Sequence, residues 1–339
     1  MHFYYDSDLN IYHDVVDAVR SGKQCWFYFN DDVLSKVDWK IEPTESLSEL
    51  YRIRAQQIRD EYPYLILCYS GGTDSTAVLE TFYYNNIHID EILMVGALSQ
   101  DPHEGSDKNQ NGCLYHNAFP LLSKLSLPNT KITTLDYTQY FENDKVKDFS
   151  LIKQYGDEWM KHTGVYHSVT HLFWYDLKRI VGAYNNKKTA VIFGSEKTFP
   201  LIDHNDRSYV SFSNQSFCDY GNIYNNENFH RVNFFSSGDQ TSINIMVKQA
   251  HVVTNVRRFC AKQKLKEPHI NDIIYEYRDK PTFTSLKCVY PVLSPRDTFL
   301  LGKKDSEIYK AFEYGKEFLN KYIPISKQTV LTSRRYYIE

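Results

Sequence analysis

The stretch LILCYSGGTDSTAVL, residues 65–79, decides the fold. An apolar run typical of a buried strand stops at polar and glycine residues, and a helical pattern follows at once. Gly71 and Gly72 let the backbone approach an anion closely, and the start of the next helix directs N–H groups and its positive dipole end to the same place. The stretch therefore predicts a strand–loop–helix unit that holds phosphate. The alternative is a tight turn without a ligand.

The side chains of the loop fit this prediction in two ways. Ser70, Thr73 and Ser75 offer hydroxyl donors to a phosphate. Asp74 repels phosphate, so we expect it either to hold a Mg²⁺ that bridges to the phosphates or to cap the helix.

Residues 70–75 resemble the Ser-Gly-Gly-x-Asp-Ser loop of the N-type ATP pyrophosphatases, the PP-loop or adenine nucleotide α-hydrolase-like family. The loop is not a Walker loop, because no Gly-Lys-Ser/Thr follows, and it is not the dinucleotide Gly-x-Gly-x-x-Gly. The resemblance implies a Rossmann-like PP-loop/HUP fold, with ATP and Mg²⁺ bound at residues 70–75. It covers residues 64–97 and extends less specifically to about residue 200.

The pattern around this loop predicts an α/β fold with a doubly wound, mostly parallel sheet. Apolar runs predict strands and helical spacings predict helices in alternation. The expected strands are 64–69, 91–97, 131–135 and 189–194, and the expected helices are 75–85, 151–162 and 168–182. Ligands of such sheets bind beyond the carboxyl ends of the strands.

We expect two flanking regions. Residues 1–63 form an N-terminal α+β flank with a strand at 24–29 and a helix that begins at the capping box of Ser46 and Glu49 and ends before Pro63. Residues 64–235 form the ATP-binding domain. Residues 236–339 form a helical C-terminal region, with one helix capped by Asp239 and others at 270–279 and 305–322.

Two further segments are candidates for the site. The resemblance places Gly96 and Ala97, at the end of the second strand, beside the adenine; an ordinary strand end is the alternative. Glu196 and Lys197 follow a buried strand, so Glu196 can complete the Mg²⁺ coordination with Asp74, and Lys197 can neutralise charge on the departing pyrophosphate. A charged turn facing water is the other interpretation.

The polar segment 98–117 is long for a connection, and it is either a cover over the substrate or a solvated insertion.

Composition narrows the functional class. The 339 residues carry a net charge of −3, which argues against a protein that coats nucleic acid by electrostatics alone. The six cysteines have no Cys-x-x-Cys pair and no zinc spacing, so we expect neither a disulfide framework nor a zinc site. No apolar run is long enough for a membrane span, and the first residues do not resemble a signal peptide. We therefore expect a cytoplasmic protein without a membrane partner.

The resemblance also implies a reaction. A substrate oxygen, from a carboxylate, amide or carbonyl, attacks the α-phosphate of ATP, pyrophosphate leaves, and a nucleophile then displaces AMP. Asp74 and Lys197 are the expected catalytic residues. Thiolating and zinc-containing relatives carry cysteine clusters that this chain lacks, so we expect a nitrogen nucleophile, as in asparagine synthetase-like synthetase domains. His2 stands where the glutamine-dependent enzymes have a nucleophilic Cys, so ammonia or an amine would come from a separate donor.

Two other functions stay open. An RNA- or nucleobase-modifying PP-loop enzyme would use the basic residues of the helix after Asp239, from Lys248 to Lys266; a solvated helix face is the simpler reading of them. A non-catalytic ATP sensor or scaffold would bind the nucleotide without turnover. The acceptor is accordingly a small molecule or RNA.

Overall fold

A computed structural model describes residues 3–13, 15–96, 98, 114–136, 187–194, 198, 200–214, 228–262 and 331–338. The helices and strands of these residues are β1 (Tyr4–Asp6), β2 (Ile11–Tyr12), α1 (Val15–Arg20), β3 (Cys25–Phe27), α2 (Asp31–Leu34), α3 (Leu47–Glu61), β4 (Tyr64–Cys68), α4 (Thr73–Tyr84), β5 (Glu91–Gly96), the π-helix η1 (Leu114–Ala118), α5 (Phe119–Leu122), β6 (Lys131–Asp136), β7 (Thr189–Phe193), β8 (Leu201–Ile202), β9 (Ser208–Val210), β10 (Phe229–Asn233), α12 (Gln240–Lys262) and β11 (Tyr336–Tyr337).

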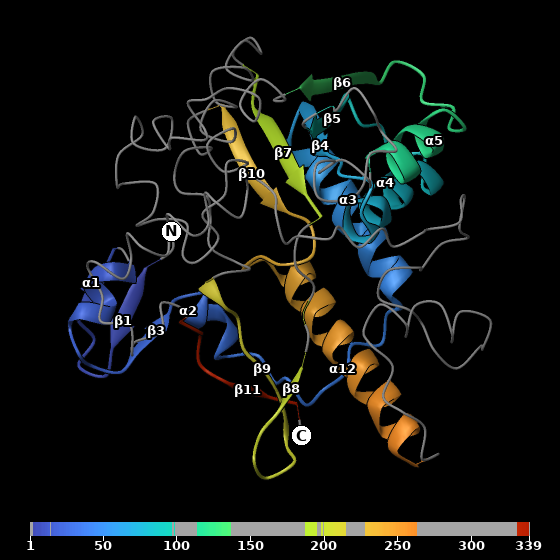
Figure 1. Cartoon of the computed structure of the whole chain (residues 1–339). Coiled ribbons are helices and arrows are strands. Elements are labelled where there is room, and N and C mark those ends of the chain that lie inside the picture. The colour runs from blue at the N-terminus through green and yellow to red at the C-terminus, as the bar shows by residue number, and fades with distance from the viewer. Residues whose placement is uncertain are drawn as a thin grey trace.

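A five-stranded sheet in the order β10-β7-β4-β5-β6 forms the centre of the fold, and every pair in it is parallel (Figure 1). The chain starts in the middle at β4, builds outward through β5 and β6, and then returns to the other side of β4 for β7 and β10. The direction of building reverses between β4 and β7. This arrangement is a Rossmann-like α/β fold, and the reversal is the place where such sheets bind ligands.

Helices α3 and α4 cover one face of this sheet. Leu65, Leu67 and Ile192 from the strands pack in one core with residues of both helices, such as Tyr51 and Val78. Side chains alternate between the two faces of a strand. Cys68, Phe193 and the residues two positions away from them on their strands therefore belong to the opposite face.

Local signals placed the first of these helices correctly. Ser46 is the N-cap of α3, and its hydroxyl accepts a hydrogen bond of 3.2 Å from the Glu49 amide. The apolar side chains along one side of α3 are buried, namely those of Leu47, Leu50, Tyr51, Ala55 and Ile58. The C-cap Tyr62 has extended backbone ahead of Pro63, because the residue before a proline disfavours helical geometry.

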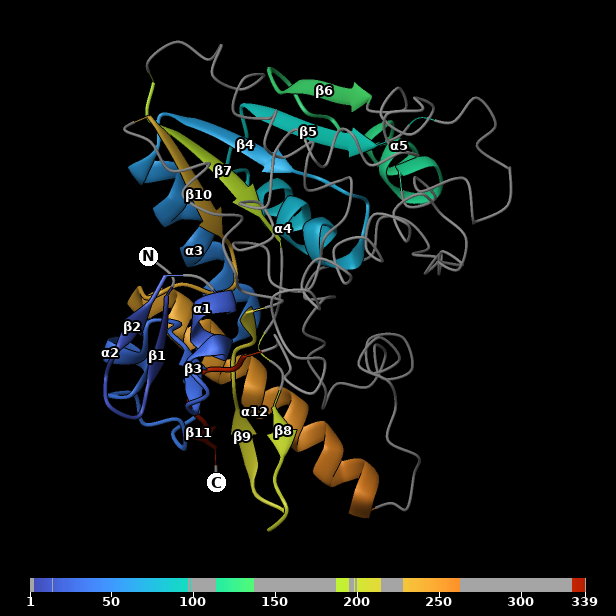
Figure 2. The ribbon, with the colours of Figure 1, turned by 60° about the vertical axis from the view of Figure 1, so that its left-hand side comes forward.

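A second core lies below the parallel sheet (Figures 1 and 2). It combines the antiparallel sheet β2-β1-β3, helices α1 and α2, strand β9 and the tail strand β11. Helix α12 contributes to both cores, with Ile245 and Val253 on the sheet side and Met246 and Ala250 on the other. Residues 236–262 thus join the N-terminal flank to the parallel sheet.

The end of the chain is extended rather than helical. Tyr336 and Tyr337 pair with Val210 and Tyr209 in an antiparallel ladder. The Phe27 amide also donates to the Thr332 carbonyl oxygen over 2.9 Å, so the tail lies between β3 and β9. The domain boundaries at 63 and 236 stay a prediction, but packing connects residues on both sides of each.

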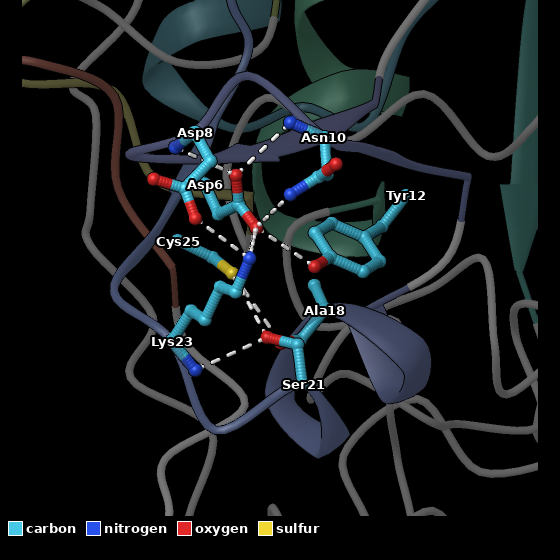
Figure 3. A network of polar contacts seen from close by, with 8 residues as sticks. All are labelled: Asp6, Asp8, Asn10, Tyr12, Ala18, Ser21, Lys23 and Cys25. Carbon is cyan, nitrogen blue, oxygen red and sulfur yellow. Dashed lines mark hydrogen bonds and ion pairs between the residues drawn. The ribbon is translucent and has the colours of Figure 1, made fainter.

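A buried carboxylate organises the first hairpin (Figure 3). Asp6 accepts hydrogen bonds from the amides of Asp8 and Asn10, the Asn10 side chain and the Tyr12 hydroxyl, all at 2.8 to 2.9 Å. The Lys23 ammonium lies 3.1 Å away. Burial alone would raise the pKa of Asp6, but these bonds outweigh it and hold that pKa well below its usual range.

Other expected elements have mixed outcomes. The strands predicted around 24–29, 64–69, 91–97, 131–135 and 189–194 are confirmed, and so is the helix after the loop. Strand β10 was not predicted. The helices predicted at 151–162, 168–182, 270–279 and 305–322 lie outside the described residues. Within the described part of the chain, no helix is long and apolar enough to cross a membrane.

Candidate functional site

The loop between β4 and α4 lies at the reversal point of the sheet. Strand β4 ends at Cys68, and α4 begins five residues later at Thr73. Strand β7, the neighbour of β4 on the other side of the reversal, ends at the same level, since Phe193 pairs with Cys68. The sequence-predicted phosphate loop thus occupies the position at which α/β sheets bind ligands.

The two glycines of the loop have different roles. Gly71 has a φ of 73°, a left-handed conformation that favours glycine. Gly72 is the N-cap of α4, with extended backbone and no side chain to accept from the first turn. The N–H groups at this helix start are therefore not consumed by a side-chain cap, and together with the helix dipole they form an environment that favours an anion.

Gly194 brings the end of β7 against the loop. A Cβ added at Gly194 would lie only 2.8 Å from the Asp74 carbonyl oxygen and 2.8 Å from the Ser75 Cα. No larger residue fits between the two backbones without a shift. The sequence placed Gly194 at a strand end, but it did not show that this glycine contacts the loop.

The serine hydroxyls of the loop bond to the loop itself. The Ser70 and Ser75 hydroxyls lie 3.1 Å apart, and Ser75 Oγ donates to the Gly72 carbonyl oxygen over 3.1 Å. The Gly72 amide donates to Ser70 Oγ over 3.2 Å, and Thr76 Oγ1 donates to the same Gly72 carbonyl over 2.8 Å. Ser75 is buried and Ser70 is exposed. Ser75 thus shapes the loop, and Ser70 has the better access to a ligand.

A residue that the sequence did not single out also holds the loop. Asn117 of η1 donates from Nδ2 to the Gly71 carbonyl oxygen over 3.3 Å. It belongs to the end of the long polar segment 98–117, most of which lies outside the described residues. One end of that segment therefore contacts the candidate site.

The remaining predicted site residues divide into two groups. Asp74 lies in the first turn of α4 and is partly exposed, and Gly96 ends β5 in a buried position beside Asp136 of β6. Both are at the carboxyl edge of the sheet. Ala97, Glu196 and Lys197 lie outside the described residues, and the side chain of Thr73 is likewise not described. Among the described residues, no three His, Cys, Asp or Glu side chains form a metal-binding group.

Cys68 is the cysteine nearest in sequence to the loop. It keeps part of its surface exposed, but desolvation by the surrounding protein raises the pKa of its thiol well above the usual value. The nearby charge of Arg231 opposes this shift without reversing it. A protonated thiol is a poor nucleophile, so Cys68 is not built for sulfur transfer.

Comparison with known proteins adds no assignment. No protein-family model matches the chain, and no curated protein matches it. The fold and the geometry of the loop therefore carry the functional argument.

Proposed function

We propose that this protein is an ATP pyrophosphatase of the PP-loop type, an enzyme that adenylates a substrate oxygen, releases pyrophosphate and forms AMP when a nitrogen nucleophile attacks. The supporting observation is the placement of residues 70–75. Their glycine loop and uncapped helix start lie at the reversal point of a parallel sheet, with the β7 backbone in close contact at Gly194.

The residues present fit a Mg²⁺–ATP complex. Mg²⁺ usually keeps several waters and takes one or two carboxylates together with phosphate oxygens, so a preformed cluster of three acids is not required. Asp74 supplies a partly exposed carboxylate in the same turn as the helix amides. When bound, Mg²⁺ would neutralise charge on the phosphates. The loop amides and Ser70 would orient them, and Gly96 would leave room for the flat base at the end of β5.

The cysteines are the reason for proposing a nitrogen nucleophile rather than a sulfur nucleophile. The chain has no paired cysteines of the kind that sulfur-transferring relatives use. Cys68, which ends the strand before the loop, has a raised pKa, so its thiol stays protonated. Ammonia or an amine supplied from elsewhere is accordingly the better second substrate.

RNA modification is the second candidate, and the contacts of α12 make it weaker. Lys248 forms an ion pair of 2.8 Å with Glu42, His251 bonds to the Trp39 carbonyl oxygen over 3.0 Å, and Arg257 donates to the carbonyl oxygen of Pro200. Three of the basic groups on this helix thus take part in internal contacts. A nucleic acid would find a smaller cationic surface there than the sequence suggests.

The test is substrate-dependent release of pyrophosphate. The full chain is incubated with Mg²⁺–ATP and a panel of carboxylates, amides and ureido compounds, with and without ammonium, and pyrophosphate, AMP, ADP and phosphate are quantified. Asp74→Ala should abolish release, whereas Asp38→Ala, which removes an exposed carboxylate of the N-terminal flank, should not. Formation of ADP and phosphate would contradict the proposal. Tight ATP binding without turnover across the panel would favour a nucleotide sensor.

A further inference from the structure

A pocket lies at the end of α4 that is far from the loop of residues 70–75. Its lining comes from the second half of α4, from the connection between α4 and β5, and from the connection between α5 and β6. Strands β5 and β6 begin directly after these connections, so the pocket lies at the amino edge of the parallel sheet. Its volume is about 640 Å³, within the range of pockets that bind small molecules.

The buried part of the lining is apolar. Leu79, Phe82 and Ile89 belong to the core that α3 and α4 form with the sheet. Ile87 and Leu127 pack against the same core and keep part of their surface exposed. A ligand in the pocket would cover apolar surface that water now reaches, and this favours binding roughly in proportion to the area covered.

Aromatic residues form much of the remaining lining. Tyr83 and Tyr84 end α4, and their ring centroids lie 5.6 Å apart with the ring planes at 76°. Phe82 and His88 line the pocket as well. Aromatic side chains pack well against the faces and edges of other rings, so this lining favours a ligand with flat rings.

The pocket offers no charged partner to a ligand. Among the described residues that line it, none is a lysine, an arginine, an aspartate or a glutamate. The ion pair next to it is already satisfied, because Asp90 lies 2.7 Å from Arg59 and also accepts from the Leu65 amide over 2.8 Å. His88 can gain a charge by protonation, and its Nε2 already has Asp90 Oδ1 at 3.7 Å. An ionic group would lose water here without gaining a counter-charge, so the lining favours an uncharged ligand.

The two connections around the pocket are fixed to each other. Thr130 Oγ1 donates to the Ile89 carbonyl oxygen over 2.8 Å and joins one connection to the other. Asn86 and Asn129 have φ values of 54° and 63°, a left-handed conformation that asparagine adopts more readily than most residues. Both are exposed and line the pocket, so their neutral amides can bond to polar groups of a ligand. Fixed walls reduce the ordering that binding would require.

We propose that this pocket binds an uncharged small molecule with flat aromatic rings, roughly two or three rings in size. The site is separate from the nucleotide site and does not depend on the proposed adenylation. Helix α4 has 12 residues, which is about 18 Å at the usual rise per residue. A ligand in the pocket and ATP at residues 70–75 therefore bind at opposite ends of this helix and do not compete.

The experiment titrates the full chain with N-phenyl-1-naphthylamine, a neutral aromatic compound whose fluorescence rises in apolar surroundings. Anilinonaphthalene sulfonate, the same ring system with a negative charge, is the matched compound. Ser126→Trp fills the pocket from an exposed lining position, and Tyr83→Ala removes one of its rings. Ser123→Trp is the control, because Ser123 is also exposed, precedes Ser126 on the same connection and does not line the pocket. Circular dichroism checks that each variant is folded.

The wild type should bind one molecule of the neutral probe per chain. It should bind the sulfonate about tenfold more weakly or worse, because the charge loses water without a counter-charge. Ser126→Trp and Tyr83→Ala should each weaken the neutral probe about fivefold or more, whereas Ser123→Trp should bind it like the wild type. Saturating Mg²⁺–ATP should not displace the probe.

Equal or tighter binding of the sulfonate would overturn the proposal, and so would absence of binding up to the solubility limit of the neutral probe. Wild-type affinity in both pocket variants would place the probe elsewhere on the chain and contradict it. The same loss in Ser123→Trp as in Ser126→Trp would also count against the pocket. Displacement by Mg²⁺–ATP would place the probe at the nucleotide site and overturn the proposal, while the proposed function would stand.

Discussion

Replacement of Gly194 by alanine should displace the loop between β4 and α4. The new methyl group would lie 2.8 Å from two backbone atoms of Asp74 and Ser75, whereas ordinary contact begins near 3.4 Å, so the backbones must separate by about 0.6 Å. Such overpacking costs about 1–3 kcal/mol.

The unfolded state offsets part of this cost. Alanine restricts the unfolded chain and stabilises a protein by about 0.4–1 kcal/mol where its backbone geometry is allowed. The φ of Gly194 is not among the positive values, so alanine is allowed there. The expected net destabilisation of Gly194→Ala is therefore about 0.5–2 kcal/mol.

Gly238→Ala is the matched control. Its methyl group would lie 3.2 Å from a side-chain oxygen of Asn30, which can move, rather than from backbone. The unfolded-state gain is the same in both variants and cancels in their difference. The difference in free energy of unfolding between the two variants should accordingly equal the overpacking cost of about 1–3 kcal/mol.

Urea unfolding followed by circular dichroism gives this difference from the transition midpoints if the two slopes agree. Gly194→Ala should also weaken ATP binding, because the shift moves the start of α4, whereas Gly238→Ala should not. Equal midpoints for the two variants would refute the close approach of β7 to the loop. Unequal midpoints with equal ATP binding would show that the approach is structural and unrelated to the nucleotide.

Three further predictions concern stability. Ser46→Ala removes the N-cap of α3 and should lower the free energy of unfolding by about 0.5–2 kcal/mol in urea titrations, with Ser46→Asn restoring most of it. Arg54→Met breaks the 2.9 Å ion pair that Arg54 on α3 forms with Asp239 at the start of α12. Because the Asp239 side chain is 38% exposed, the free energy of unfolding should fall by only about 1–3 kcal/mol. A double-mutant cycle with Asp239→Asn that shows no coupling would argue against the pair. Burial alone would raise the pKa of Asp203, but hydrogen bonds from the backbone and side chain of Arg207 and from the backbone of Asn205 lower that pKa to about 2, below its unfolded value near 3.9. The ionised carboxylate therefore stabilises the fold fully above about pH 4, and this stabilisation is lost as the pH falls towards 2. Asp203→Asn should remove that part of the pH dependence of the free energy of unfolding.

Local signals in the sequence were enough for several elements. The Ser46 cap and the apolar stripe after it specify α3, and the buried run before Ser70 specifies β4, because capping and periodicity depend only on neighbours in the chain. The order of strands and helices likewise predicted the parallel sheet. The loop of residues 70–75 was identified on the same basis.

Other features depend on partners that are distant in sequence. Three of the five residues of β10, His230, Arg231 and Asn233, are polar and partly exposed, so no buried apolar run marks this strand. The tail at 331–338 was expected in a helical region, but it pairs with β9 because an extended segment fits between two existing strands. Neither strand β10 nor the pairing of the tail with β9 can be predicted from the local sequence pattern alone.

The sequence by itself determined that a glycine-rich loop joins a buried strand to a helix, because this pattern depends only on residues that are neighbours in the chain. Tertiary structure decided what surrounds that loop. Pairing of β7 beside β4 brings Gly194 against Asp74, η1 brings Asn117 to Gly71, and β10 adds Arg231 on the face of the sheet opposite α3 and α4. Strand order and register determine which residues surround the loop. They depend on the burial of apolar faces between segments that are distant in sequence, so no single segment predicts them.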